Sequence, residues 1–224
     1  MKEKFTNFIL ELLFPKFCFN CQREGSYLCE DCRATLEISE VHQPGYPPSV
    51  GPTQNLRDLY FAIDYQKPLI KNLIQRFKYE PFVKELAFPL SSLIIEHFQL
   101  IDNKPNFANF FLVPVPLEEK KLKWRGFNQA EEIAKELSKF LNLEILNDVL
   151  IKVKETLPQV ELATEAREEN IKGVFSIKNG DLIKNRRILL IDDVYTTGAT
   201  MNEGARVLKE FGAKEIIGIV VARG

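Results

Sequence analysis

One stretch near the C-terminus constrains the fold of this 224-residue chain more than any other. The four apolar residues from Ile188 to Ile191 are typical of a strand buried on both faces, and Asp192 and Asp193 mark its carboxyl end. Small and hydroxyl residues come next. The residues after them repeat at helical spacing, with Gly212 as the stop: Met201, Ala205, Leu208 and Phe211. The stretch therefore predicts a strand, an anion-binding turn and a helix.

The residue types in this turn indicate a ligand. A tight turn at a helix N-terminus directs several backbone N–H groups and the positive end of the helix dipole at one point, which suits a phosphate. Gly198 lets the backbone approach closely, and the threonine hydroxyls of the turn supply further donors. Because paired carboxylates repel a phosphate, Asp192 and Asp193 suit hydroxyl groups or a divalent cation beside it. A phosphate with vicinal hydroxyls describes a phosphorylated ribose.

The segment 192–200 closely resembles the loop with which type I phosphoribosyltransferases bind phosphoribosyl pyrophosphate (PRPP). The resemblance implies that the acidic pair holds the ribose 2- and 3-hydroxyls and that the turn holds the 5-phosphate. A Walker A loop would end in Lys-Ser/Thr and a dinucleotide fold would space its glycines, so the remaining alternative is an acidic strand end before an ordinary helix. The residues assigned to PRPP are Asp192, Asp193, Tyr195, Thr196, Thr197, Gly198, Ala199 and Thr200.

All four cysteines lie in two Cys-x-x-Cys pairs, Cys18 with Cys21 and Cys29 with Cys32, separated by seven residues. Each pair places two thiolates on one turn, and two such turns facing each other complete a tetrahedral zinc site. Four sulfur ligands leave no open position, so we expect a structural Zn²⁺ that holds together a module too small for its own core. Disulfides or unused thiols are the alternative, which a reducing cytosol disfavours.

Proline and glycine gather between residues 39 and 56, which indicates a linker. We predict an N-terminal helix and four-cysteine zinc module (1–38), the linker (39–56) and a phosphoribosyltransferase-like domain (57–224). The last part alternates strand and helix patterns, which favours the α/β class: a Rossmann-like, mostly parallel sheet with helices on both faces. Further expected strands are 59–65, 110–115, 173–177 and 215–222, and expected helices are 68–77, 82–98 with a bend or break at Pro89, and 127–141.

Four cations fall within six residues of the segment 117–126, between an expected strand and an expected helix: Lys120, Lys121, Lys123 and Arg125. Such a charge run is either a solvated loop or a mobile lid that closes over a polyphosphate. The lid is an alternative because the segment follows a strand, where α/β sheets place their ligand crevice, and the lysines leave both interpretations open.

The stretch 125–131, Arg-Gly-Phe-Asn-Gln-Ala-Glu, is similar to the signature of the competence protein F (ComF) family. Other motifs agree with that family in the same order, and they span nearly the whole chain: the four cysteines, Phe77-Lys78-Tyr79, Val113-Pro114-Val115-Pro116, the polar run from Thr156 to Phe175, and the PRPP loop. The resemblance implies a phosphoribosyltransferase domain with a role in DNA uptake during natural transformation.

In a phosphoribosyl transfer, pyrophosphate leaves the anomeric carbon, and an oxocarbenium-like ribosyl cation meets an acceptor nucleophile. Mg²⁺ bound to the pyrophosphate and ribose hydroxyls would neutralise much of the departing charge, and Lys78 and Arg125 would help. Asp192 and Asp193 would fix the ribose beside the developing cation. These four residues are the candidate catalytic residues, and the sequence indicates no general base for the acceptor.

Two hypotheses from different classes follow. The first is a Mg²⁺-dependent phosphoribosyltransferase with an unidentified acceptor. The second is a catalytically silent sensor of PRPP or a ribonucleotide, whose zinc module and basic segment engage single-stranded DNA or a DNA-uptake protein, with Trp124 available to stack a base. Cations that point inward from the segment 117–126 would favour the first hypothesis, and an outward stripe beside Trp124 the second.

Bulk properties limit the partners and the location. A net charge of −1 and a pI of about 6.2 give no global attraction to nucleic acid, so any such contact must use a local patch. No apolar run reaches the length of a membrane span. Glu3 and Glu11 interrupt the apolar residues of the first 13 positions, and no small-residue cleavage site follows. We therefore expect a short amphipathic helix rather than a signal peptide, and a cytoplasmic protein.

Overall fold

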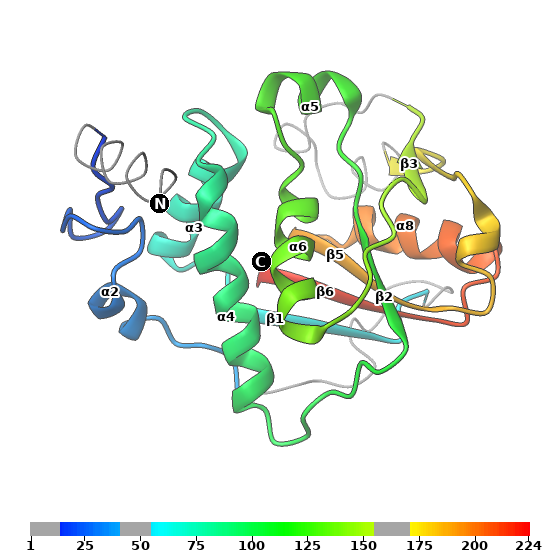
Figure 1. Cartoon of the computed structure of the whole chain (residues 1–224), viewed down its shortest axis with the longest axis horizontal. Coiled ribbons are helices and arrows are strands. Elements are labelled where there is room, and N and C mark those ends of the chain that lie inside the picture. The colour runs from blue at the N-terminus through cyan, green and yellow to red at the C-terminus, as the bar shows by residue number, and fades with distance from the viewer. Residues whose placement is uncertain (1–13, 41–54, 155–170) are drawn as a thin grey trace, which may run out of the picture.

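A parallel four-stranded sheet forms the centre of the computed structural model (Figure 1), which describes residues 14–40, 55–154 and 171–224. The expected N-terminal helix, most of the linker and the polar run 156–170 lie outside the described residues. The strand order is β1-β6-β5-β2, and all three neighbouring pairs are parallel, so the predicted α/β fold class is confirmed. The strands are β1 (Asp58–Asp64), β6 (Glu215–Arg223), β5 (Arg187–Tyr195) and β2 (Phe110–Pro114).

Helices cover the sheet on both faces because β5 and β6 send alternate apolar side chains to each side. Leu189 and Ile191 pack with α3 (Pro68–Lys78), α4 (Ala87–Leu100) and α6 (Gln129–Leu141). Ile188 and Leu190 pack on the other side with α8 (Ala199–Glu210) and with a small antiparallel sheet of β3 (Leu150–Lys152) and β4 (Phe175–Ile177). All four of these β5 side chains are fully buried, as expected for a central parallel strand.

The four-cysteine module packs against this domain. It contains α2 (Glu30–Ala34), which lies beside α3 and α4 in Figure 1. Cys18, Cys29 and Cys32 are buried in the same apolar cluster as the helices of that face. Arg33 forms a 2.7 Å ion pair with Glu96 of α4, and the Ser39 N–H donates to the Ala62 carbonyl of β1 at 2.8 Å. The module therefore shares its core with the sheet domain.

Three expectations about local structure were wrong. The segment 117–126, expected to be a loop, is mostly helix, α5 (Glu119–Arg125). Pro89 does not break a helix over 82–98, because α4 begins at Ala87 and places the proline in its first turn, where no N–H is needed. Phe211 is 48% exposed because it follows the last residue of α8, so it does not share the buried face of Met201.

The remaining described segments are short. Two 3₁₀ turns occur, η1 (Lys84–Leu86) and η3 (Gly180–Leu182). The sequence pattern did not predict β3, which pairs with β4 through three residues on each strand. Among the residues that the structure describes, no helix combines the length and the apolar character that crossing a membrane requires.

Candidate functional site

The acidic pair lies within β5, near its carboxyl end, since the strand continues to Tyr195. Asp193 is only 5% exposed, and Asp192 retains partial exposure. The Asp193 N–H donates to Asp192 Oδ1 at 2.8 Å, which orients the first carboxylate. Burial, followed by the charge of the neighbouring Asp193 carboxylate, raises the pKa of Asp192 to about 7 even though the Lys78 ammonium lowers it. The strand end therefore holds two crowded carboxylates that are stabilised by positive charge nearby.

The turn after β5 has the backbone geometry of an anion site. Gly198 adopts a left-handed φ of +79° immediately before the first residue of α8, and its carbonyl accepts from the Asn202 N–H at 2.8 Å. The Tyr195 ring lies against this glycine so closely that a Cβ there would be 2.1 Å from the tyrosine hydroxyl oxygen. Only glycine satisfies both conditions. The N-terminus of α8, a position that favours anions, thus comes shortly after the acidic pair.

Lys78, at the C-terminal end of α3, reaches the acidic pair from a different element. Its Nζ lies 2.8 Å from Asp193 Oδ1, and the two side chains are 27% and 7% exposed. Burial alone would lower the pKa of Lys78, but the charges of Asp193 and Asp192 outweigh it, so the pKa is raised and the ammonium stays charged. The structure therefore brings together Lys78 and Asp193, as the sequence-based list of candidate residues required.

Arg125 is the last residue of α5, and Gly126 ends that helix with a left-handed φ of +78°. The guanidinium donates from Nη1 to Gln129 Oε1 at 3.1 Å and lies 5.6 Å from the centre of the Tyr79 ring. Burial lowers the pKa of Arg125, and the attraction of Asp193 counteracts that effect. The second candidate cation is therefore close enough to Asp193 to be attracted by its charge.

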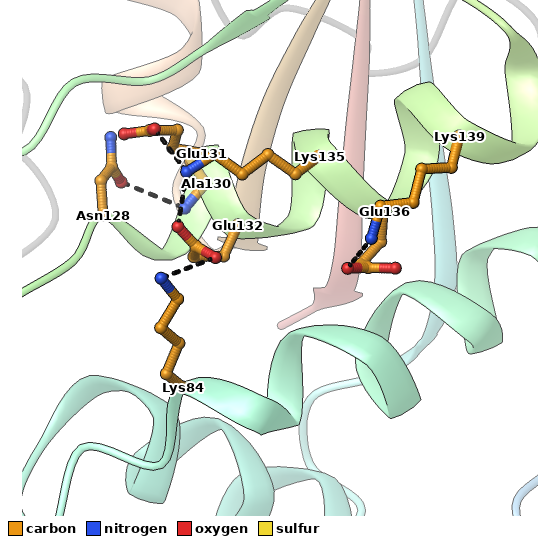
Figure 2. Close-up of polar contacts among 8 residues, drawn as sticks. All are labelled: Lys84, Asn128, Ala130, Glu131, Glu132, Lys135, Glu136 and Lys139. Atoms are coloured by element: carbon orange, nitrogen blue, oxygen red, sulfur yellow. Dashed lines mark hydrogen bonds and ion pairs between the residues drawn. The ribbon is translucent and has the colours of Figure 1, made fainter. Parts of the chain in front are cut away.

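The residues after Arg125 explain why this stretch is a recognisable motif. Phe127 packs its ring against Phe77 at 5.5 Å between centroids, and Gln129 donates from Nε2 to the Phe77 carbonyl at 2.8 Å. Asn128 caps α6 by accepting from the Ala130 N–H at 3.1 Å, as Figure 2 shows. The same view shows Lys84 of η1 pairing with Glu132 of α6 at 3.2 Å.

The other cations of α5 divide into two groups. Lys123 faces solvent and pairs with Glu119 at 2.6 Å, both side chains being at least three-quarters exposed. Lys121 is less exposed and pairs with Glu118 at 3.3 Å. Trp124 is 57% exposed, and its ring meets the edge of Phe82 at 4.8 Å between centroids. The segment therefore forms neither a wholly inward set nor a continuous outward stripe.

Lys152 is a neighbour of the site that the sequence analysis did not select. Burial lowers its pKa, Lys121 adds to that effect, and Glu118 and Asp192 oppose it, so its ammonium is close enough to feel the first carboxylate of the pair. Its side chain is half-buried in β3. A lone cation between the apolar neighbours Ile151 and Val153 was the available signal in the sequence.

The four cysteines form a cluster whose dimensions fit zinc. Their four Sγ atoms all lie within 4.8 Å of one another, and Cys21 Sγ is 3.5 Å from Cys29 Sγ. A tetrahedral Zn²⁺ with Zn–S bonds of about 2.3 Å holds its sulfurs about 3.8 Å apart. Although burial acts in the opposite direction, hydrogen bonds from the backbone N–H groups of Cys29, Cys21 and Asn20 lower the pKa of Cys18 to about 6. The cluster suits a closed structural site.

The fold and a domain comparison agree on the class of protein. The family described as "Phosphoribosyl transferase domain" matches residues 123–224, which contain β5, the acidic pair, the turn and α8. Together with the parallel sheet, this defines a phosphoribosyltransferase-like α/β domain that carries an N-terminal four-cysteine module. Such domains commonly use Mg²⁺, and the carboxylate oxygens of Asp192 and Asp193 are the hard ligands that this ion prefers.

Whole-chain comparisons add the family. "Competence protein F" of Haemophilus influenzae is 38% identical over 207 residues, which cover 91% of this chain and 82% of that protein. "DNA utilization protein YhgH" of Escherichia coli K12 is 28% identical over 89% of this chain and 85% of its own length. A solved Bacillus subtilis glutamine PRPP amidotransferase in complex with ADP and GMP aligns with 61% of this chain and 25% of its own, with 16% identity and a TM-score of 0.37. The chain belongs to the competence protein F (ComF) family.

Proposed function

We propose that this chain binds PRPP with Mg²⁺ at the carboxyl end of β5 and acts as a phosphoribosyltransferase whose acceptor remains to be identified. One observation carries the proposal: the acidic pair, the left-handed Gly198 and the N-terminus of α8 follow one another at the end of an interior parallel strand, where Lys78 of α3 contacts Asp193. Arg125 of α5 lies within electrostatic reach of the same carboxylate. Anion-binding and cation-binding groups thus lie side by side, as a sugar bearing phosphates requires.

Each group has a role that follows from its chemistry. Asp193 and Asp192 accept hydrogen bonds from the ribose hydroxyls, and the N–H groups at the start of α8, with the Thr196, Thr197 and Thr200 hydroxyls, hold the 5-phosphate. Lys78 and Arg125 neutralise the leaving pyrophosphate, to which Mg²⁺ would contribute further charge stabilisation. Because Lys78 already contacts Asp193, it stands close enough to the sugar to act on the group that departs from it.

The proposed biological setting is DNA uptake during natural transformation. It rests on the names of two similar proteins, one a competence protein and the other a DNA utilization protein. We propose a cytoplasmic location and the three-part division into residues 1–38, 39–56 and 57–224 as parts of the same proposal. The packing of the cysteine module on α3 and α4 supports a single working unit.

A second candidate function is a silent PRPP or nucleotide sensor that engages single-stranded DNA or a DNA-uptake protein. The exposed face of Trp124 beside the outward Lys123 favours it, because an exposed ring next to a cation suits a stacked base and its phosphate. The attraction between Arg125 and Asp193 favours the enzyme, because it places a cation near the proposed sugar site. An assay of pyrophosphate release from PRPP, in the presence of Mg²⁺ and of candidate bases or DNA, separates the two functions. The enzyme should release pyrophosphate and the silent sensor should not.

Calorimetric titration with PRPP and Mg²⁺ tests the site itself. Asp193→Asn removes a carboxylate charge, and Thr197→Val removes one hydroxyl without changing shape, so each should weaken PRPP binding about 10-fold to 100-fold, the worth of a charge-assisted hydrogen bond. Asp181→Asn, at an exposed acid in η3, is the matched control and should bind as the parent does. Unchanged affinity in both site variants would contradict the assignment.

A further inference from the structure

The turn between the first two cysteines touches the helix that carries Lys78. Phe19 lies between Cys18 and Cys21, and its carbonyl accepts a hydrogen bond from Asn72 Nδ2 of α3 at 3.1 Å. The guanidinium of Arg76, one helical turn further along α3, lies 4.3 Å from the centre of the Phe19 ring. Tyr27 stacks on the same ring, with centroids 5.1 Å apart and planes 10° from parallel. The Cys18–Cys21 turn thus contacts α3 through a single aromatic residue, Phe19.

This contact lies at the end of α3 that leads into the site. Arg76 donates from Nε to Asn72 Oδ1 at 2.9 Å, and its carbonyl accepts from the Val83 N–H at 2.9 Å, so both ends of the residue are fixed. Lys78 follows two residues later as the last residue of the helix, and its Nζ lies 2.8 Å from Asp193. A helix transmits a shift along its axis because its backbone is hydrogen-bonded from turn to turn.

We propose that Phe19 and Arg76 are positioning residues for Lys78, and that metal loading of the four cysteines is thereby coupled to PRPP binding. The inference rests on the proposed PRPP site and deepens it. Metal binding fixes the Cys18–Cys21 turn, which holds Phe19 against Arg76 and keeps the last turn of α3 where Lys78 meets Asp193. Without the metal, the turn keeps only its hydrogen bonds, such as that from the Phe19 N–H to the Tyr27 carbonyl at 3.0 Å, and Lys78 is held less firmly.

Coupling of this kind has a size and a reciprocal consequence. A cation–π contact and one side chain to backbone hydrogen bond support a coupling of about 5-fold to 20-fold in affinity. Removal of zinc should therefore weaken PRPP binding by that factor. By thermodynamic linkage, saturating PRPP should tighten zinc binding by the same factor, which competition with a chelator measures without any turnover.

Three variants and one control isolate the contact. Phe19→Ala removes the ring, and Arg76→Met removes its partner outside the module while all four cysteines stay in place; each should weaken PRPP binding about 5-fold to 20-fold. Phe19→Trp keeps an aromatic ring at this position and should keep the PRPP affinity of the parent. The control is Arg33→Gln, which breaks the 2.7 Å ion pair between the module and Glu96 of α4. Because α4 does not carry Lys78, this variant should bind PRPP as the parent does.

The ¹⁵N signal of the Lys78 ammonium gives a readout that general destabilisation would not reproduce. Arg76→Met should shift or broaden it with one zinc still bound per chain, and Arg33→Gln should not. If the parent binds PRPP and Arg76→Met matches it in affinity and in the Lys78 signal, the inference is overturned and the proposed function stands. If the parent binds no PRPP, the proposed function fails, and the zinc dependence of the Lys78 signal still decides whether the module positions this lysine.

Discussion

Gly198→Ala should damage the turn after β5 by a predictable amount. The new Cβ would lie 2.1 Å from the Tyr195 hydroxyl oxygen and 2.3 Å from its Cζ, far inside van der Waals contact. A left-handed φ costs a residue with a Cβ about 1–2 kcal/mol. Because Tyr195 is only 5% exposed, its displacement within the core adds about 1–3 kcal/mol. The sum is a loss of about 2–5 kcal/mol in the free energy of unfolding.

Gly126 provides a matched control for this substitution. It has nearly the same φ, +78° against +79°, but a Cβ there would meet nothing within 4 Å. Gly126→Ala should therefore lose only the backbone contribution of about 1–2 kcal/mol. Urea denaturation of both variants measures the difference, and calorimetry of Gly198→Ala should show that PRPP binding is lost with the displaced turn. Equal destabilisation at the two glycines would refute the role given to the tyrosine.

The remaining predictions concern the charged pair and the cysteines. Lys78→Met should lower the free energy of unfolding at pH 7 by about 2–4 kcal/mol, somewhat below a fully buried pair because Lys78 is 27% exposed. In the parent, Lys78 lowers the pKa of Asp192, which is nevertheless raised to about 7. In Lys78→Met the pKa of Asp192 should be higher still, so ionisation of this carboxyl destabilises the folded variant more than the folded parent as pH rises. The deficit should thus shrink from pH 8 to pH 5 in thermal denaturation. Cys18→Ser should release zinc and loosen the module, and a variant that retains one zinc per chain by metal analysis would point to other ligands.

The parts of the fold that the sequence predicted are those whose signals are contiguous. The buried strand, the acidic pair, the turn and α8 occupy one run of residues, so apolar spacing and one glycine were enough to order them. The cysteine cluster follows from spacing alone, because each Cys-x-x-Cys fixes its own turn. Even here the prediction that Phe211 lies on the buried face of α8 was wrong, since the pattern of apolar residues does not indicate at which residue a helix ends.

The contacts that sequence patterns could not supply join distant elements. The approach of Lys78 to Asp193 depends on how α3 packs on the sheet, and neither residue's neighbours in sequence encode that distance. The helix α5 is a different case, because its signals were present: Lys123 pairs with Glu119 one turn away, and Gly126 supplies a left-handed stop. A dense charge run was interpreted as a loop although its spacing was helical.

The segment from Arg125 to Gln129 shows how the positive side of the site is assembled. Gly126 ends one helix, Asn128 begins the next, and Gln129 donates to the carbonyl of Phe77, the residue directly before Lys78. Gln129 also accepts from the Arg125 guanidinium, so one buried amide connects both cations near Asp193. Because that amide is shared, the positions of Lys78 and Arg125 depend on each other. The position of the positive charge near the acidic pair therefore depends on the contacts among three helices, α3, α5 and α6, rather than on any one of them.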